Sequence, residues 1–202
     1  MRETVITIAV LNLWLAGCMP IATPTPMVLP TPIAAETTAE TSITCTGVLT
    51  SRNMEGPYYS TGAPERASLI EPGMAGTPIY ITGRVFDETC TPLADAKVDF
   101  WQADASGVYD NAGYTLRGHV VTDENGAYAI ETIEPGVYPG RPPHIHVKVF
   151  AADGRELLTT QMYFAGSETS RDVRTAPDLF VPYLGLDAKG RQQIAFDFVV
   201  QR

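Results

Sequence analysis

From residue 77 onward, short runs rich in β-branched and aromatic residues alternate with Gly, Pro, Asn or Asp. Runs of this kind, bounded by turn residues, predict β-strands. Asn125-Gly126 suits the positive φ angles of a tight hairpin. Helix signals are limited to a possible short turn near Thr169–Arg174. The chain is therefore expected to form an all-β sandwich or barrel whose strands are Pro78–Phe86, Lys97–Gln102, Ala127–Ile133, His144–Phe150, Leu157–Phe164 and Gln192–Val199.

The N-terminus has the features of an export signal. Residues Val5–Gly17 form an apolar run shorter than the roughly 20 residues that a membrane-spanning helix needs. The run ends in Leu15-Ala16-Gly17-Cys18, which resembles the lipobox of bacterial lipoproteins, where the cysteine is lipid-modified. We interpret residues 1–18 as a lipoprotein-type signal peptide, and we expect an exported, membrane-anchored lipoprotein that faces the cell exterior or periplasm. An ordinary signal peptide with a chance cysteine is the alternative, favoured by Glu3 beside Arg2.

The next segment has a composition of a different kind. Residues 19–43 are rich in Pro, Thr and Ala and contain no Lys or Arg. Such a segment cannot bury a core and favours extended, polyproline-like conformations. We interpret it as a tether that would hold a domain away from a membrane surface. The folded domain is then expected at residues 44–202.

The chain is acidic, with 14 Lys and Arg against 23 Asp and Glu and a formal charge of -9. This charge gives no diffuse attraction to nucleic acid, so we expect no DNA or RNA partner. Two cysteines, Cys45 and Cys90, remain in the predicted domain. Outside the cytoplasm an even pair favours a disulfide between them, and two separate thiols are the alternative.

The most informative local feature is His144-Ile145-His146 within a predicted strand. Residues two apart in a strand project from the same face, so both imidazoles would point the same way. They could be half of a metal site, or two polar residues on a solvated face. The preceding segment 139–143, Pro-Gly-Arg-Pro-Pro, favours the metal site because it constrains how the strand begins.

The remaining ligands would have to come from other parts of the chain. Tyr109 and Tyr138 both lie beside turn residues, where a phenol oxygen is available as a hard donor. Two phenolates and two imidazoles suit a hard, oxidised iron better than zinc or copper. A tyrosine beside a turn can equally be a packing residue, so spacing alone leaves both readings open.

Several motifs, in this order, resemble the intradiol ring-cleavage dioxygenases, the group that includes protocatechuate 3,4-dioxygenase, catechol 1,2-dioxygenase and hydroxyquinol dioxygenase. The resemblance covers roughly residues 53–165 and implies an antiparallel β-sandwich with long active-site loops and little helix. The segments that carry it are Glu55–Tyr59, Asp99–Tyr109, Leu116–Gly118, Thr122–Tyr128, Pro135–Pro139, Arg141–His146 and Gln161–Phe164.

The resemblance implies a ligand set for a non-haem Fe(III) cofactor. Carried over residue by residue, the ligands would be Tyr109, Tyr138, His144 and His146. In the family, a catechol-type substrate displaces one tyrosinate, which corresponds to Tyr138, and is cleaved with O2 to a cis,cis-muconate-type dicarboxylate. A catechol-type molecule and O2 are therefore the expected partners, with the membrane contacted only through the lipid anchor.

Further residues match the family's substrate pocket. Arg141 and Gln161 match an active-site arginine and glutamine, which would stabilise negative charge that develops on the ring. Tyr58 and Tyr59 match a less constant segment near the site. His119 falls where the family has no ligand, and we interpret it as structural.

The sequence departs from the cytoplasmic family members in two ways. Only five residues separate Tyr138 from His144, which implies a more open pocket, and the helical dimerisation domain of the catechol enzymes is missing. The ring substituents of the substrate are therefore not predicted, and a homo-oligomer is left as a possibility. Two other functions remain as alternatives: a non-catalytic, transthyretin-like β-sandwich that binds a partner, and a sandwich that binds zinc or copper.

Overall fold

The computed structural model of the protein describes residues 45–164 and 166–202. The predicted signal peptide with Cys18 and the predicted tether lie outside these residues. The described residues lie in one compact unit, which contains the hydrophobic core. Across the two described ranges, no helix is long and apolar enough to cross a membrane.

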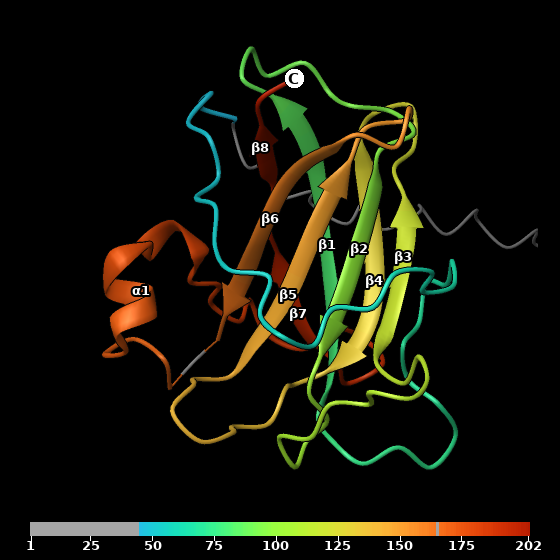
Figure 1. The fold of residues 1–202 in the computed structure, drawn as a ribbon, viewed down its shortest axis with the longest axis vertical. Coiled ribbons are helices and arrows are strands. Elements are labelled where there is room, and N and C mark those ends of the chain that lie inside the picture. The colour runs from blue at the N-terminus through green and yellow to red at the C-terminus, as the bar shows by residue number, and fades with distance from the viewer. Residues whose placement is uncertain (1–44, 165) are drawn as a thin grey trace, which may run out of the picture. The chain divides into compact units, whose positions relative to one another are not determined.

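Two sheets pack face to face and confirm the prediction of an all-β sandwich (Figure 1). One sheet has the strand order β4-β1-β7, with β8 also paired to β1, and the other has the order β3-β2-β5-β6. The strands are β1 (Pro78–Asp87), β2 (Lys97–Gln102), β3 (Arg117–Val121), β4 (Ala127–Ile133), β5 (His144–Phe150), β6 (Glu156–Tyr163), β7 (Gln192–Ala195) and β8 (Phe198–Val200).

The sheet that contains β1 is mixed, and in this one respect it differs from the expected antiparallel sandwich. Strands β7 and β8 both run parallel to β1. The reason is the long connection after β6, which includes the short helix α1 (Arg171–Thr175) and the 3-10 turn Pro177–Leu179. It brings the chain back at the end where β1 begins, and β7 therefore runs in the same direction as β1 (Figure 1).

The predicted strand Gln192–Val199 is in fact two strands. The break falls where the chain crosses Gly83 of β1, at which a Cβ would lie 1.8 Å from the carbonyl oxygen of Phe196. Next to it, the carboxylate of Asp197 accepts a hydrogen bond of 2.7 Å from the backbone N–H of Arg84. A side chain thus replaces a backbone acceptor and interrupts the ladder.

Strand β5 separates the hydrophobic core from a second buried face. Ile145, Val147 and Val149 point into the core between the sheets. The alternate residues His144, His146 and Lys148 point the other way, yet they too are buried. Because the outer face of β5 is also buried, another segment of the chain must pack over it.

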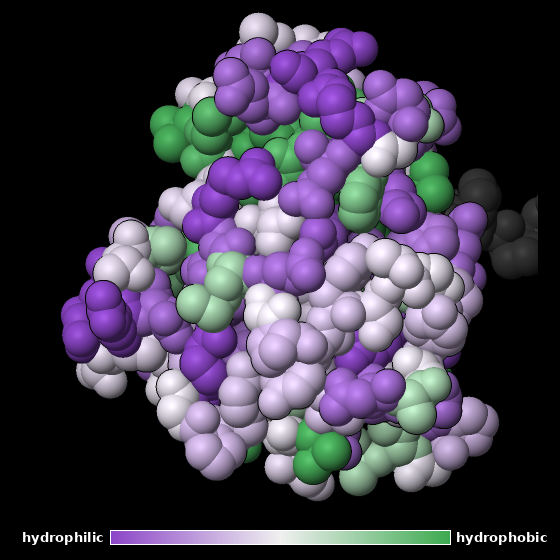
Figure 2. Space-filling view, viewed as in Figure 1, coloured by the Kyte–Doolittle hydropathy of each residue, from purple (hydrophilic) through white to green (hydrophobic). Residues whose placement is uncertain are grey.

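That cover is the segment that precedes the first strand, which crosses in front of β5 and β6 in Figure 1. The backbone N–H of Asn53 donates to the carbonyl oxygen of Thr159 in β6 at 2.9 Å. Lys148 forms an ion pair of 2.7 Å with Glu55 on the same segment. Three apolar side chains of this segment, Val48, Leu49 and Met54, are exposed. Hydrophobic side chains gather near the top of the same face, and most of the rest of it is hydrophilic or near-neutral (Figure 2).

A disulfide joins Cys45 to Cys90, with their Cα atoms 5.8 Å apart. It fixes the start of the covering segment to the turn between β1 and β2. Because Lys97 at the start of β2 pairs with Phe150 at the far end of β5, this turn lies at the opposite end of the sheet from His144.

Candidate functional site

A row of buried side chains crosses the outer face of the β3-β2-β5-β6 sheet. Arg117 of β3 pairs with Trp101 of β2. Trp101 pairs in turn with His146 of β5, and His146 pairs with Gln161 of β6. Residues directly opposite each other in neighbouring strands project from the same face. The register of the sheet therefore brings a cation, an indole, an imidazole and an amide side by side beneath the covering segment.

The imidazoles of His144 and His146 meet at the start of β5. Their Nε2 atoms are 3.1 Å apart, and both side chains are buried. The Nδ1 atom of His144 lies 2.6 Å from the carbonyl oxygen of Pro142. A carbonyl oxygen only accepts, so Nδ1 carries the proton of the neutral ring and Nε2 keeps its lone pair. A histidine that binds a metal through Nε2 has this arrangement.

The two candidate phenol ligands come from two loops that are joined by a backbone hydrogen bond. The carboxylate of Asp104 accepts hydrogen bonds of 2.8 and 3.0 Å from two backbone N–H groups of its own turn, which leads to Tyr109. The carbonyl oxygen of Asp104 accepts one of 2.9 Å from the N–H of Gly136, on the loop that carries Tyr138. A Cβ on Gly136 would lie 2.5 Å from the carbonyl oxygen of Ala105. Glycine is therefore required for this close approach.

The structure brings the four predicted metal ligands together. The phenol oxygen of Tyr109 is 3.5 Å from Nε2 of His144. The rings of Tyr109 and Tyr138 have centroids 5.8 Å apart, and those of Tyr138 and His144 are 5.6 Å apart. Tyr109 and His146 lie at 6.2 Å. Two loops and one strand thus supply two oxygen and two nitrogen donors to one place.

Burial sets the charge state of these groups. Desolvation lowers the pKa of His144 to about 4 and that of His146, with a further contribution from His144, to about 2. Desolvation also raises the pKa of Tyr109 and of Tyr138. At neutral pH both imidazoles are therefore uncharged and available as ligands. The phenols keep their protons unless a bound cation favours the phenolate form.

This donor set fits a hard, oxidised metal ion. Phenolate oxygen and imidazole nitrogen together suit Fe(III), whereas structural zinc sites use thiolate and imidazole. In the part of the chain that the structure describes, no group of three or more His, Cys, Asp or Glu could hold a metal ion. A metal at this place would accordingly depend on the two tyrosines as well as on the histidines.

Arg141 and Gln161 lie beside the four candidate metal ligands and are hydrogen-bonded to each other. The Nη2 atom of Arg141 donates to Oε1 of Gln161 at 2.6 Å, and the Gln161 amide donates to the carbonyl oxygen of Met54 at 2.8 Å. The phenol of Tyr163 also donates to Oε1 of Gln161, at 2.6 Å. The guanidinium acts on Tyr138, where its positive charge opposes the rise of the phenol pKa. Both predicted pocket residues thus adjoin the site.

The two neighbouring tyrosines of the covering segment lie in different surroundings. Tyr58 stacks on Tyr109, with ring centroids 4.3 Å apart, and lies 6.4 Å from Tyr138. Tyr59 instead contacts Trp101 and donates a hydrogen bond of 3.1 Å to the carboxylate of Asp99. Of the pair that was assigned to the substrate pocket, the structure places only Tyr58 against the candidate ligands.

Two further residues of the site were not singled out from the sequence. Trp101 stacks on His146 with ring centroids 4.8 Å apart and an interplanar angle of 10°. Arg117 donates to the carbonyl oxygens of Asp110 and Tyr58. Both residues lie within motifs of the family resemblance, but their contacts depend on the sheet register, which no local pattern fixes.

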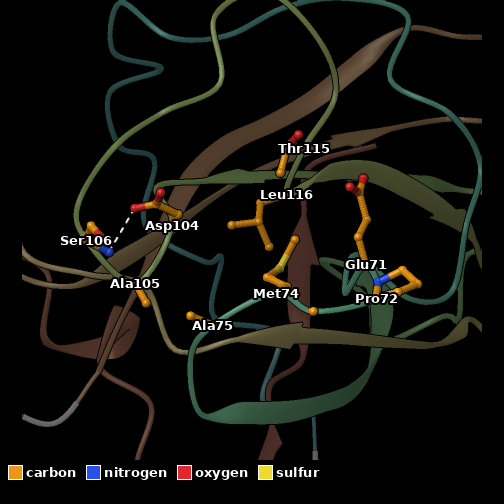
Figure 3. A pocket seen from close by; sticks show the side chains of 10 residues that line it. Glu71, Pro72, Met74, Ala75, Asp104, Ala105, Ser106, Thr115 and Leu116 are labelled. Atoms are coloured by element: carbon orange, nitrogen blue, oxygen red, sulfur yellow. Dashed lines mark hydrogen bonds between the residues drawn. The ribbon is translucent and has the colours of Figure 1, made fainter.

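His119 lies away from the four donors, in keeping with its interpretation as structural. Its Nδ1 atom is 2.8 Å from the carbonyl oxygen of Ala63. A separate pocket of about 320 Å³ lies behind the loop that leads to Tyr109, and none of the four candidate ligands lines it. Figure 3 shows its wall, including the Asp104 carboxylate, which is bonded to the backbone of Ser106.

The fold and site together define a class: β-sandwich proteins with a buried two-histidine, two-tyrosine site at one end of a sheet. The sequence pattern of the Dioxygenase family matches residues 54–201. The chain therefore belongs to this family, the intradiol ring-cleavage dioxygenases, which are oxidoreductases.

Relatives and solved structures agree with this assignment. Catechol 1,2-dioxygenase of Acinetobacter baylyi is 33% identical over 61% of this chain and 49% of that protein, so the chain spans about half of its length. The dioxygenase domain of a dioxygenase carbohydrate-binding protein fusion from Streptomyces sp. SirexAA-E is 41% identical, with a TM-score of 0.69 over 76% of this chain and 99% of that chain. The structure of 3-chlorocatechol 1,2-dioxygenase from Rhodococcus opacus 1CP is 30% identical, with a TM-score of 0.67 over 76% and 73%.

Proposed function

We propose that the protein is a non-haem Fe(III) dioxygenase that cleaves catechol-type aromatics with O2, between the two hydroxylated carbons, to a cis,cis-muconate-type dicarboxylate. The observation that carries the proposal is the convergence of Tyr109, Tyr138, His144 and His146 at one buried place. A transthyretin-like binding module would have no use for four convergent donors, of which three are buried and one is half-buried. Family membership supports the same reaction class.

When bound, a ferric ion would supply the chemistry that activates the catechol toward O2. The three most buried donors, Tyr109, His144 and His146, are the residues suited to hold the ion throughout. Tyr138 is only half-buried, and its phenol pKa is raised. With a ferric ion bound, Tyr138 would be a phenolate, and its more exposed oxygen would then be the donor best placed to take up a proton from a catechol hydroxyl as the substrate enters.

Arg141 and Gln161 supply fixed polarity on one side of the site. The Nη2–Oε1 hydrogen bond of 2.6 Å orients the amide, whose nitrogen is committed to the carbonyl oxygen of Met54. The guanidinium is then the group that can stabilise negative charge on the ring. The loss of Arg141 should therefore lower the rate of turnover more than the affinity for iron.

The first test combines visible spectroscopy with iron quantification on residues 42–202. A broad tyrosinate-to-iron absorption band that shifts with catechol, followed by muconate absorbance under air, is the expected result. Tyr109→Phe and His146→Ala should abolish bound iron and turnover together, whereas Arg141→Ala should stay coloured but slow. A protein that stays colourless and inert after ferric reconstitution would contradict the proposal.

The histidine and tyrosine substitutions have matched controls in the same chain. His119→Ala removes the remaining histidine, and Tyr80→Phe removes a phenol on β1, which contacts Arg191 rather than the site. Both controls should keep the colour and the activity. Equal loss in His119→Ala and His146→Ala would mean that unfolding, and not ligation, explains the effect.

We also propose that the protein is an exported lipoprotein whose domain is tethered through Cys18. The support is the lipobox-like sequence, the Pro-rich segment 19–43 and the Cys45–Cys90 disulfide, a bond typical of oxidising compartments. Metabolic labelling with a radioactive fatty acid should mark the wild type and not Cys18→Ser. A protein that stays in the cytoplasm with residues 1–18 intact would contradict this location.

A further inference from the structure

Two cations act on the candidate ligands, and one of them is buried and hydrogen-bonded to the backbone. Arg117 and Arg141 are the arginines whose charge affects the phenol of Tyr109. Arg117 is 1% exposed, and each of its side-chain nitrogens donates to a backbone carbonyl, of Asp110 or of Tyr58, at 2.5 to 2.9 Å. Because Arg117 is buried beneath these contacts, its guanidinium is not accessible to a substrate group.

Arg141 is engaged by a carboxylate of the chain itself. Its Nε atom is 3.3 Å from Oδ2 of Asp172 on α1, and its Nη2 atom donates to Gln161. The side chains of Arg141 and Asp172 are 18% and 29% exposed. The long connection between β6 and β7 thus brings the Asp172 carboxylate, which is not part of either sheet, into an ion pair with the Arg141 guanidinium.

This pairing bears on which catechol can bind. A substrate carboxylate directed at Arg141 would meet a guanidinium that is already paired with a carboxylate, and it would add a second full negative charge close to Asp172. Like charges at close range in a partly buried site repel each other and weaken binding. The rest of the surroundings are aromatic rings, including Tyr58, Tyr109 and Tyr138, which favour an uncharged ring.

We propose that the site takes catechols without a carboxylate, and that Asp172 sets this preference by holding Arg141. The inference rests on the proposed function and adds a substrate class to it. Asp172 touches neither the donors nor the substrate in this account, so it is a positioning residue that acts through Arg141. Replacing Asp172 should therefore affect charged and uncharged substrates differently. A variant that had only lost stability would affect both kinds of substrate equally.

The experiment compares kcat/KM for catechol and 3,4-dihydroxybenzoate in the wild type, Asp172→Asn and Glu168→Gln. The last variant removes one negative charge from the exposed loop that precedes α1 and is the matched control. The wild type should prefer catechol, and Asp172→Asn should shift the ratio toward 3,4-dihydroxybenzoate by about tenfold. The control should leave both values unchanged. A wild type that turns over both substrates equally well, or a variant that lowers both values by the same factor, would overturn the proposal.

A binding measurement separates this inference from the proposed reaction. Trp101 is the only tryptophan of residues 42–202 and stacks on His146, so its fluorescence reports on the site without a metal. In the metal-free domain, 4-hydroxybenzoate should bind about tenfold more tightly to Asp172→Asn than to the wild type, with 4-methylphenol unchanged. If no catechol is cleaved but this shift is seen, the reaction is wrong and the role of Asp172 stands. If catechol is cleaved and no shift is seen, the role of Asp172 is wrong.

Discussion

Replacing Arg117 by methionine should destabilise the domain and weaken the site together. The guanidinium joins two segments that meet over the outer face of the sheet. Two of its nitrogens donate to the carbonyl oxygen of Asp110, directly after Tyr109, and the third donates to that of Tyr58. Methionine has a similar length and fills the space, but it offers no donor.

The magnitude follows from the groups left behind. Two partly buried carbonyl oxygens lose their donors, and an unsatisfied buried group costs about 1–3 kcal/mol. Part of this is offset, because the folded state no longer has to bury a guanidinium charge. We therefore expect Arg117→Met to lower the free energy of unfolding by about 2–4 kcal/mol. Because Tyr58 stacks on Tyr109, the ligand phenol should also lose its fixed orientation.

The assay is urea unfolding of the metal-free domain, followed by titration of the refolded variant with ferric iron. Arg191→Met is the matched control, since Arg191 bonds the carboxylates of Asp187 and Glu131 on the other side of the molecule. Those carboxylates can turn to water, so the control should lose less stability and should bind iron normally. An Arg117→Met domain with wild-type stability and wild-type iron affinity would refute the reasoning.

Other predictions follow from the disulfide, from an ion-pair cluster and from Trp101. Removing the Cys45–Cys90 bond, which closes a loop with a sequence separation of 45, should cost about 4 kcal/mol in urea unfolding, and no effect of reductant would contradict this. Hydrogen bonds from Ser68 and Arg191 lower the pKa of the Glu131 carboxyl in the folded protein. The ionised carboxylate therefore stabilises the fold above the ordinary glutamate pKa, and this contribution is lost as the pH falls through the folded value. Glu131→Gln should be less stable than the wild type at pH 7, and the difference should disappear in acid. Ferric iron should quench the fluorescence of Trp101, and unchanged emission on iron loading would argue against a metal at the neighbouring histidine.

Local patterns predicted those strands that have a clear boundary. The observed limits of β2, β4 and β5 are the predicted ones, because each run ends in residues that favour turns. Strand β3 was not predicted, since Gly118 and His119 interrupt the apolar pattern and its stability comes from pairing with β2. The break between β7 and β8 depends on the close approach of Gly83 to Phe196, a contact between residues far apart in the sequence.

The same distinction applies to the site. The alternation of side chains along a strand was enough to place His144 and His146 on one face, and motif order was enough to nominate Tyr109 and Tyr138. That the four groups meet was decided by the hydrogen bonds that tie the two loops together and by the backbone at Pro142. The sequence contained the donor types but not their separations, because those depend on long-range packing.

What the sequence by itself determined is therefore the chemistry that is available: an all-β chain with two imidazoles, two phenols and a neighbouring arginine in family-like order. Only the tertiary structure decided which other side chains contact these groups. The sheet register sets Trp101 against His146, and the connection after β6 returns Asp172 to Arg141. The physical reason is that strand pairing and loop return join residues distant in sequence, whose contacts are selected by the packing of the whole domain and not by local propensity.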